Sequence, residues 1–160
     1  MTEVAGAEGI AAVMNRQRRV KIALPALREF LWRICQQLGL AETELVICFV
    51  TDAEMARMNE AYRKKPGPTD VLSFPAVQKR KRRTEKHRAG VARGARYLGD
   101  IAIAPAVAQR NARKYGRGLQ TELRILMLHG VLHLQGYDHE TDQGQMNRLE
   151  MKLRRRLELA

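Results

Sequence analysis

The chain has 160 residues, 45% of them apolar, and a formal net charge of +12. This length predicts a single domain with one hydrophobic core, and no apolar run in the sequence is long enough for a membrane-spanning helix. The N-terminal segment fits no signal peptide, so we expect a cytoplasmic protein with no membrane partner, in which Cys35 and Cys48 are reduced core thiols.

Positive charge is concentrated in residues 78–96, which contain nine Lys or Arg residues and one Glu, a net charge of +8. Such a segment attracts polyanions, because each phosphate that it neutralises releases condensed counterions. The alternative is a solvated loop without a specific partner. The candidate phosphate contacts are Lys79, Arg80, Lys81, Arg82 and Arg83.

The chain is predicted to begin with a tail that does not join the fold. Residues 1–17 are assigned to this mobile tail, and the folded domain is expected to span residues 18–160. Val20 and Ile22 would lie on one face of an extended segment, which predicts a first strand in residues 18–24.

The next part of the chain predicts two helices and two strands. Pro25 fits the first turn of a helix, and Gly39 fits its C-cap. Residues 44–52 form a continuous apolar and β-branched run, which predicts a strand buried on both faces. A second helix can be capped by Thr51 or by the residue after it, and residues 71–75 predict a short strand.

The C-terminal half is predicted to be mostly helical. A strand is predicted in residues 98–104, and helices are predicted in residues 105–115, 119–134 and 142–158. Strands and helices are mixed, and the helices gather toward the C-terminus. We therefore expect a single-domain α+β fold, with a small sheet of about four strands covered by helices.

Three of the four histidines lie within the stretch HGVLHLQGYDH, residues 129–139. His129 and His133 are one turn apart on the same face of the predicted helix. Gly136 can take the left-handed conformation that ends a helix, and the resulting turn would bring His139 back beside the other two. Three neutral imidazoles in this arrangement suit one Zn²⁺ ion, with the fourth position left for water.

Two alternatives to this open zinc site follow from the same residues. Asp138 or Asp142 can supply a fourth ligand, which would make the site closed and structural. Imidazoles also bind nickel, copper and cobalt, so another divalent transition metal is an alternative to zinc.

The spacing of the histidines is that of the metzincin proteases, whose motif carries a glutamate directly after the first histidine. Gly130 occupies that position here. Because the glutamate is the general base of the protease, its absence argues against proteolysis. Gly130 has two interpretations: it removes a carboxylate that would repel a phosphate, or it allows two elements to pack closely.

A second dense motif is AYRKKPGPTDVLSFP, residues 61–75. Arg63 can bind a phosphate through two parallel hydrogen bonds and can stabilise charge that develops on it. Alternatively, it caps the C-terminus of a helix, as basic residues often do. Asp70 and Ser73 can be turn or strand-surface residues without a chemical role.

The stretches HGVLHLQGYDH, YRKKPGPTDVLSFP and LGDIAIA together resemble the YbeY family in order and form. The resemblance covers about residues 20–155, and the basic loop is an insertion relative to the family. It implies a small α+β domain with a zincin-like metal helix and the activity of a metal-dependent endoribonuclease. It also implies that Arg63 serves RNA cleavage. The zinc ligands that it implies are His129, His133 and His139.

We therefore expect a zinc-dependent, single-strand-specific endoribonuclease in 3′-end maturation of the small-subunit rRNA and in ribosome quality control. Its expected partners are rRNA and the small subunit or assembly factors. The alternatives are a non-catalytic RNA-binding assembly factor with a structural metal, and a zinc metalloprotease. Base stacking is expected to contribute little, because the chain has only eight aromatic residues, most of which are predicted to be buried.

Overall fold

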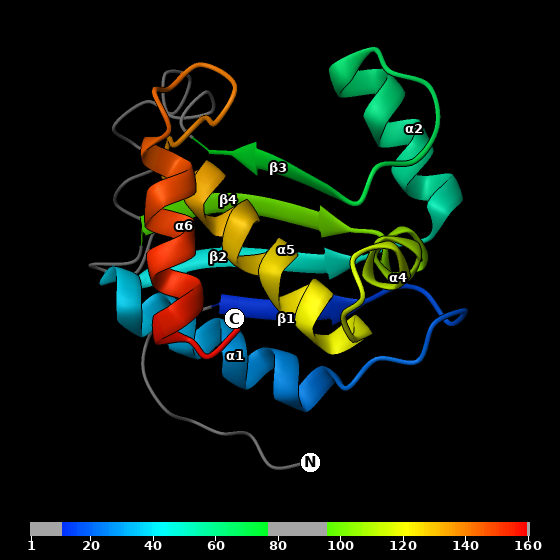
Figure 1. Ribbon diagram of the computed structural model, residues 1–160. Coiled ribbons are helices and arrows are strands. Elements are labelled where there is room, and N and C mark those ends of the chain that lie inside the picture. The colour runs from blue at the N-terminus through cyan, green and yellow to red at the C-terminus, as the bar shows by residue number, and fades with distance from the viewer. Residues whose placement is uncertain (1–10, 77–95, 160) are drawn as a thin grey trace.

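The computed structural model describes residues 11–76 and 96–159. Its centre is a four-stranded sheet in the order β1-β2-β4-β3 (Figure 1). β1, β2 and β4 run parallel, and β3 pairs antiparallel with β4 at one edge. The strands are β1 (Ala11–Asn15), β2 (Thr43–Phe49), β3 (Val71–Pro75) and β4 (Arg96–Ile103).

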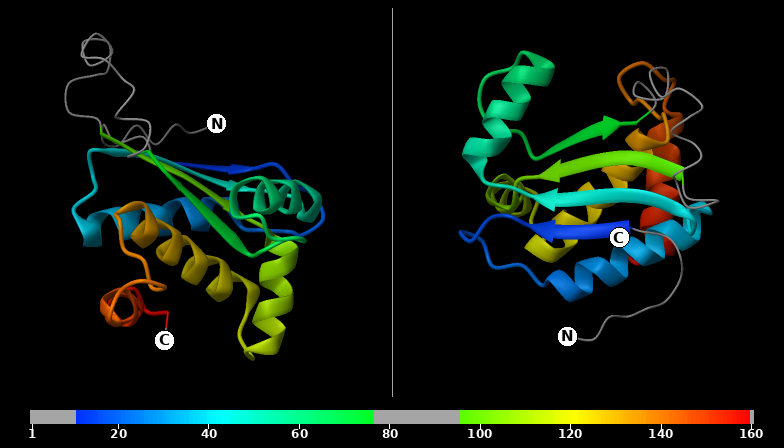
Figure 2. Two further views of the ribbon diagram at one scale, coloured as in Figure 1. Left: turned by 90° about the horizontal axis from the view of Figure 1, so that it is seen from above. Right: turned by 180° about the vertical axis from the view of Figure 1, so that it is seen from behind.

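Helices α1, α5 and α6 lie on one side of the sheet (Figure 2), with α6 packed on α5. Helix α2 covers only one end of the other side, where Met55 packs with Val50 and Leu72. In the part of the chain that the structure describes, no helix is long and apolar enough to cross a membrane. The helices are α1 (Leu24–Leu38), α2 (Asp52–Arg63), α4 (Pro105–Lys114), α5 (Leu119–Leu134) and α6 (Gln145–Arg156).

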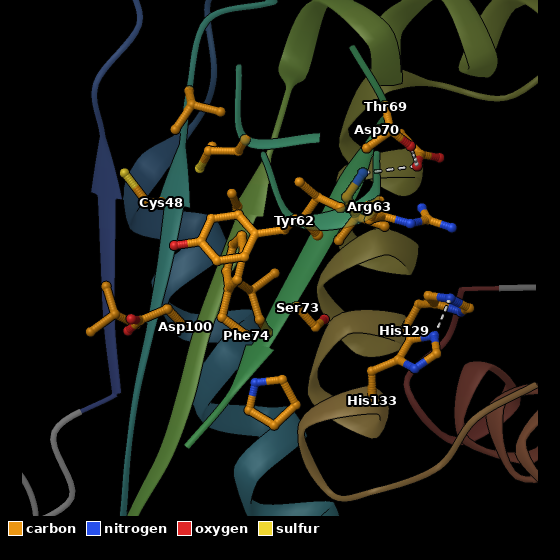
Figure 3. A pocket seen from close by; sticks show the side chains of 18 of the residues that line it. Cys48, Tyr62, Arg63, Thr69, Asp70, Ser73, Phe74, Asp100, His129 and His133 are labelled. Carbon is orange, nitrogen blue, oxygen red and sulfur yellow. Dashed lines mark hydrogen bonds between the residues drawn. The ribbon is translucent and has the colours of Figure 1, made fainter. Parts of the chain in front are cut away.

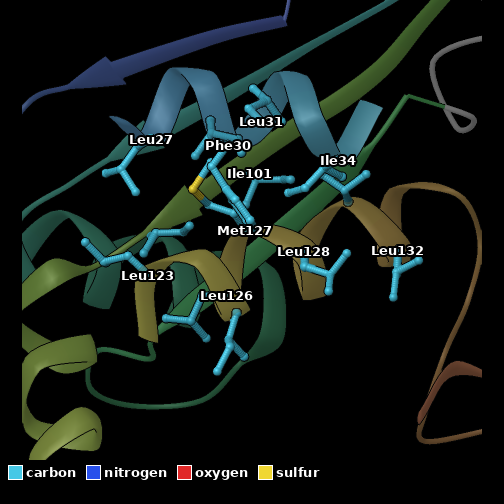
Figure 4. Close-up of a cluster of buried hydrophobic side chains, with 14 of the residues drawn as sticks. Leu27, Phe30, Leu31, Ile34, Ile101, Leu123, Leu126, Met127, Leu128 and Leu132 are labelled. Carbon is cyan, nitrogen blue, oxygen red and sulfur yellow. The ribbon is translucent and has the colours of Figure 1, made fainter. Parts of the chain in front are cut away.

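The main core lies between the sheet and helices α1, α5 and α6. Ile101 of β4 lies among side chains from α1 and α5, which include Phe30 and Met127 (Figure 4). All three side chains are at most 2% exposed. Each large apolar side chain buried in this way stabilises the fold by about 1.5–3 kcal/mol. This core therefore holds α5 firmly against the sheet.

The fold class and several helix boundaries are confirmed. Pro25 lies in the first turn of α1, and Gly39 caps the helix in the left-handed conformation, with a φ of 66°. The side chain of Thr51 accepts a hydrogen bond of 3.1 Å from the backbone N–H of Glu54 and so caps α2. Helix α5 has the predicted bounds, Leu119–Leu134.

The position of the first strand corrects the sequence prediction. β1 occupies Ala11–Asn15, inside the predicted tail, and the described residues 18–24 contain no strand. The side chain of Gln17 donates to the C=O of Val20 and accepts from its N–H. This turn buries Val20 without strand pairing. Residues 1–10 of the predicted tail lie outside the described residues.

Strand β2 is buried on one face only, which corrects the prediction for residues 44–52. Leu45 and Ile47 are 0% exposed in the core. Val46 and Cys48 on the opposite face are half-buried, because that face has no complete layer of helices among the described residues (Figure 2). The sheet therefore presents part of one face to a groove.

The two cysteines are free, as expected, and lie on opposite faces of the sheet. Cys35 is in the main core, where burial raises the pKa of its thiol to about 11. Cys48 is half-buried on the uncovered face, which corrects its assignment to the core. Burial also raises the pKa of the Cys48 thiol.

Gly130 allows α5 to pack closely on the sheet. A Cβ atom at this position would lie 2.9 Å from Cγ2 of Ile101 and 3.0 Å from its Cδ1, well inside the van der Waals contact distance. The hydroxyl of Ser73 on β3 donates a hydrogen bond of 3.2 Å to the Gly130 carbonyl. Of the two interpretations of Gly130, the structure therefore supports close packing.

We expect Gly130→Ser to lower the free energy of unfolding by about 1–3 kcal/mol, because the added atoms overpack the contact with Ile101. Gly118→Ser is the matched control, because nothing lies within 4 Å of a Cβ at that position and a serine there is a favourable N-cap. Urea denaturation of the two variants measures the difference. Equal stabilities would contradict the close-packing role.

Candidate metal centre and its groove

The three histidines of the motif converge at the C-terminal end of α5. His129 and His133 lie one turn apart on the helix (Figure 3), and their Nε2 atoms are 3.1 Å apart. Gly136 has a φ of 99°, a value that favours glycine. The turn brings Nδ1 of His139 to 3.2 Å from Nε2 of His133. One nitrogen from each ring lies within 4.8 Å of the others, and this group can hold a metal ion.

A buried carboxylate orients His129. Nδ1 of His129 lies 3.0 Å from Oε1 of Glu150, a residue of α6 that is 6% exposed. The other carboxylate oxygen of Glu150 accepts a hydrogen bond of 3.3 Å from Arg154. Burial raises the pKa of Glu150, but the hydrogen bond with His129 and the neighbouring Arg154 outweigh this effect, so the pKa of Glu150 is lowered. Glu150 thus favours the His129 tautomer that leaves Nε2 available to a metal.

The role of Glu150 is not among the predictions from the sequence, although the sequence pattern around it is informative. Glu150 falls in the buried stripe of α6, between Met146 and Leu153. An acidic side chain in such a stripe needs a buried partner, and the partner here is a histidine of the cluster.

The surroundings of the central histidine favour its neutral form. Burial is the largest cause that lowers the pKa of His133, and the neighbouring His129 and His139 lower it further. Neutral imidazole is the form that binds a metal ion. The protonation state of His133 therefore suits metal binding near neutral pH.

Neither candidate fourth ligand belongs to the cluster. Both carboxylate oxygens of Asp142 accept backbone hydrogen bonds, from Gly144 and Met146, at the start of α6. The bond from Met146 is the largest cause of the lowered pKa of Asp142. Asp138 accepts a hydrogen bond from the backbone N–H of Glu140. Among the described residues, the group that can hold a metal contains the three histidines alone.

An open groove of about 1180 Å³ joins the histidines to the uncovered face of the sheet. Figure 3 shows Arg63 on the side of His129 and His133, with Ser73 below it on β3. The groove thus combines potential metal ligands with a guanidinium group. The predicted RNA contacts in residues 79–83 lie outside the described residues.

Arg63 is the last residue of α2 and the basic residue of its last turn, and the C-cap is the residue that follows it. The left-handed residue Lys64 ends α2, and its backbone N–H bonds to the carbonyls of Asn59 and Glu60. The Arg63 guanidinium instead lies 3.8 Å from the carboxylate of Glu140, and the two side chains are 37% and 64% exposed. Such an exposed ion pair contributes little stability, so a phosphate can replace Glu140 at Arg63.

Asp70 and Ser73 connect the elements around the groove. Asp70 accepts hydrogen bonds from the backbone of Val71 and from the Asn111 side chain on α4. Ser73 links β3 to the carbonyl of Gly130 on α5. Both side chains thus fix the position of β3.

Comparison with known proteins identifies the family. The family model for endoribonuclease YbeY matches residues 12–158. The chain belongs to this family. The match to the family begins within β1, so that strand is part of the shared fold and not of a tail.

Several relatives named endoribonuclease YbeY align over most of the chain. The relative from Solibacter usitatus is 38% identical, over 93% of this chain and 89% of its own length. The relative from Koribacter versatilis is 36% identical, over 92% of this chain and 86% of its own length. The solution structure of TM1509 from Thermotoga maritima matches with a TM-score of 0.60 and 26% identity, over 92% of this chain and 89% of that one.

We expect Glu150→Gln to weaken the binding of a divalent metal about tenfold or more, because His129 loses the charged partner that fixes its ring. Titration of the metal-free protein with Zn²⁺ against a chromogenic chelator measures the affinity. Glu60→Gln is the matched control, because Glu60 is an exposed residue of α2. Unchanged affinity in Glu150→Gln would show that the buried carboxylate does not support the ligand set.

Proposed function

We propose that this chain is a zinc-dependent, single-strand-specific endoribonuclease that acts in 3′-end maturation of the small-subunit rRNA. The observation that carries the proposal is that three imidazole nitrogens and the Arg63 guanidinium border the same open groove. Relatives of similar length carry the name endoribonuclease.

The donor set fits zinc. His129, His133 and His139 would be the ligands, because their nitrogens converge and His129 is oriented by Glu150. Three neutral imidazoles with an open fourth position are a typical catalytic zinc site. Bound Zn²⁺ would polarise a phosphate oxygen and lower the pKa of water near the scissile bond.

Arg63 would hold the scissile phosphate. Its guanidinium can form two parallel hydrogen bonds with phosphate oxygens, and it would stabilise the charge that develops on them. In the free protein, the exposed carboxylate of Glu140 forms only a weak ion pair with Arg63. A phosphate brought to the histidine cluster would therefore displace it.

The chain has the histidine spacing of a metzincin protease but lacks the glutamate of that motif. A metzincin needs a glutamate at position 130 as general base. The side chain of Ile101 fills the space into which a Cβ of residue 130 would point. A glutamate therefore does not fit at position 130, and the general base of a metzincin protease is missing. The nuclease that we propose does not need this glutamate, because Arg63 would stabilise the charge on the phosphate.

The proposed place in ribosome maturation rests on charge and family. The net charge of +12 favours a polyanionic partner, and the family is described as an endoribonuclease. We infer that the substrate is rRNA, that the partners are the small subunit or its assembly factors, and that the protein acts in the cytoplasm and in ribosome quality control.

We expect His133→Ala to abolish cleavage of a labelled single-stranded rRNA fragment, and Arg63→Ala to slow it about 100-fold, the usual effect of removing a charge-stabilising donor. The matched control is Arg57→Ala, which removes an exposed arginine from the same helix. We expect it to retain activity. Initial rates on denaturing gels measure the effect.

Two results would overturn the proposed function. Cleavage that survives both substitutions would reveal a contaminating nuclease. A pure, zinc-loaded protein that binds the RNA without cutting it would instead be a binding factor with a structural metal.

A further inference from the structure

Tyr62 exposes an aromatic ring directly beside the proposed phosphate site. It precedes Arg63 on α2 and is 70% exposed, although the sequence pattern placed most aromatic residues in the core. Its ring packs against Phe74 of β3, with centroids 4.8 Å apart and an interplanar angle of 67°. This contact holds the ring in place and leaves most of it open to the groove.

The floor of the groove next to Tyr62 is apolar apart from Asp100, which lies in register with Val46 and Phe74. It is the uncovered face of the sheet, and Val46, Leu72, Phe74 and Ala102 contribute to it. In Figure 3 the Tyr62 ring lies over Phe74, with Arg63 on the side of the histidines and Asp100 on the opposite side. An apolar floor suits the faces of nucleobases and does not suit phosphates.

The charges in the groove orient a bound strand. Asp100 brings a carboxylate to the part of the groove away from the histidines (Figure 3). This carboxylate accepts a hydrogen bond from Tyr97. Carboxylates repel a phosphate backbone and accept hydrogen bonds from base amines. The backbone is therefore favoured on the Arg63 side, and the bases are favoured over the sheet.

We propose that Tyr62 forms a base-stacking subsite for the nucleotide next to the phosphate held by Arg63. The inference rests on the proposed function and adds how a single strand is held. A base in a duplex is stacked between its neighbours and paired, so it cannot turn onto the ring, whereas an unpaired base can. Tyr62 thus gives the groove a preference for unpaired RNA with little dependence on base identity.

We expect Tyr62→Ala and Tyr62→Leu to raise KM for a single-stranded RNA about tenfold with kcat unchanged, the usual effect of losing one base–aromatic stack. Tyr62→Phe keeps the ring and is expected to retain the wild-type KM. Tyr62→Leu keeps an apolar contact with Phe74, so it separates stacking from packing. Tyr115→Ala is the matched control, because Tyr115 is 58% exposed and does not line this groove.

A second measurement is independent of turnover. In the His133→Ala background, RNA with 2-aminopurine in place of one base reports stacking by fluorescence quenching. We expect quenching when residue 62 is tyrosine or when Tyr62→Phe is added. We expect the quenching to be lost in Tyr62→Ala and Tyr62→Leu.

The outcomes distinguish the two proposals. A wild-type protein that neither binds nor cleaves single-stranded RNA would overturn the proposed function and this inference with it. Normal cleavage, with KM and quenching unaffected by Tyr62→Ala and Tyr62→Leu, would overturn the stacking subsite alone. Thermal melting of each variant identifies any loss of folding, and a folded Tyr62→Leu decides the question if Tyr62→Ala is unstable.

Discussion

The contact between Gly130 of α5 and Ile101 of β4 is the constraint on which the metal centre depends. Gly130 lies between His129 and His133, so the distance of the helix from the sheet at this point sets where both rings emerge. The hydrogen bond from Ser73 adds a second connection to the edge strand β3. The imidazoles therefore reach the groove beside β3, on the same side of the groove as Arg63 (Figure 3). A larger residue at position 130 would move the ligands and the edge strand together.

The features that the sequence predicts correctly have local causes. The histidine cluster depends on helical spacing and on a left-handed turn at Gly136, both within eleven residues. The bounds of α5 follow from its long apolar pattern and the glycines that flank it. Such signals depend only on neighbouring residues, so the structure of the remaining chain does not change what they predict.

The features that the sequence misses depend on tertiary packing. β1 has only five residues, and its position is set by its parallel pairing with β2 and not by a pattern of its own. Glu150 shows a carboxylate in an apolar stripe, but only the packing of α6 on α5 reveals that its partner is His129. Tyr62 keeps helical spacing with the buried Met55, yet the last turn of α2 lies over the groove and not over the core.

The end of α2 explains how one helix can serve two parts of a nucleotide. Consecutive residues of an α-helix project about 100° apart, so Tyr62 and Arg63 point to different sides of the groove (Figure 3). The base and the phosphate of a nucleotide also diverge from the sugar between them. Lys64 takes a left-handed conformation and ends the helix, so no further turn covers the two side chains. A further helical turn after Arg63 would cover these two side chains and would hinder the binding of an RNA strand to them.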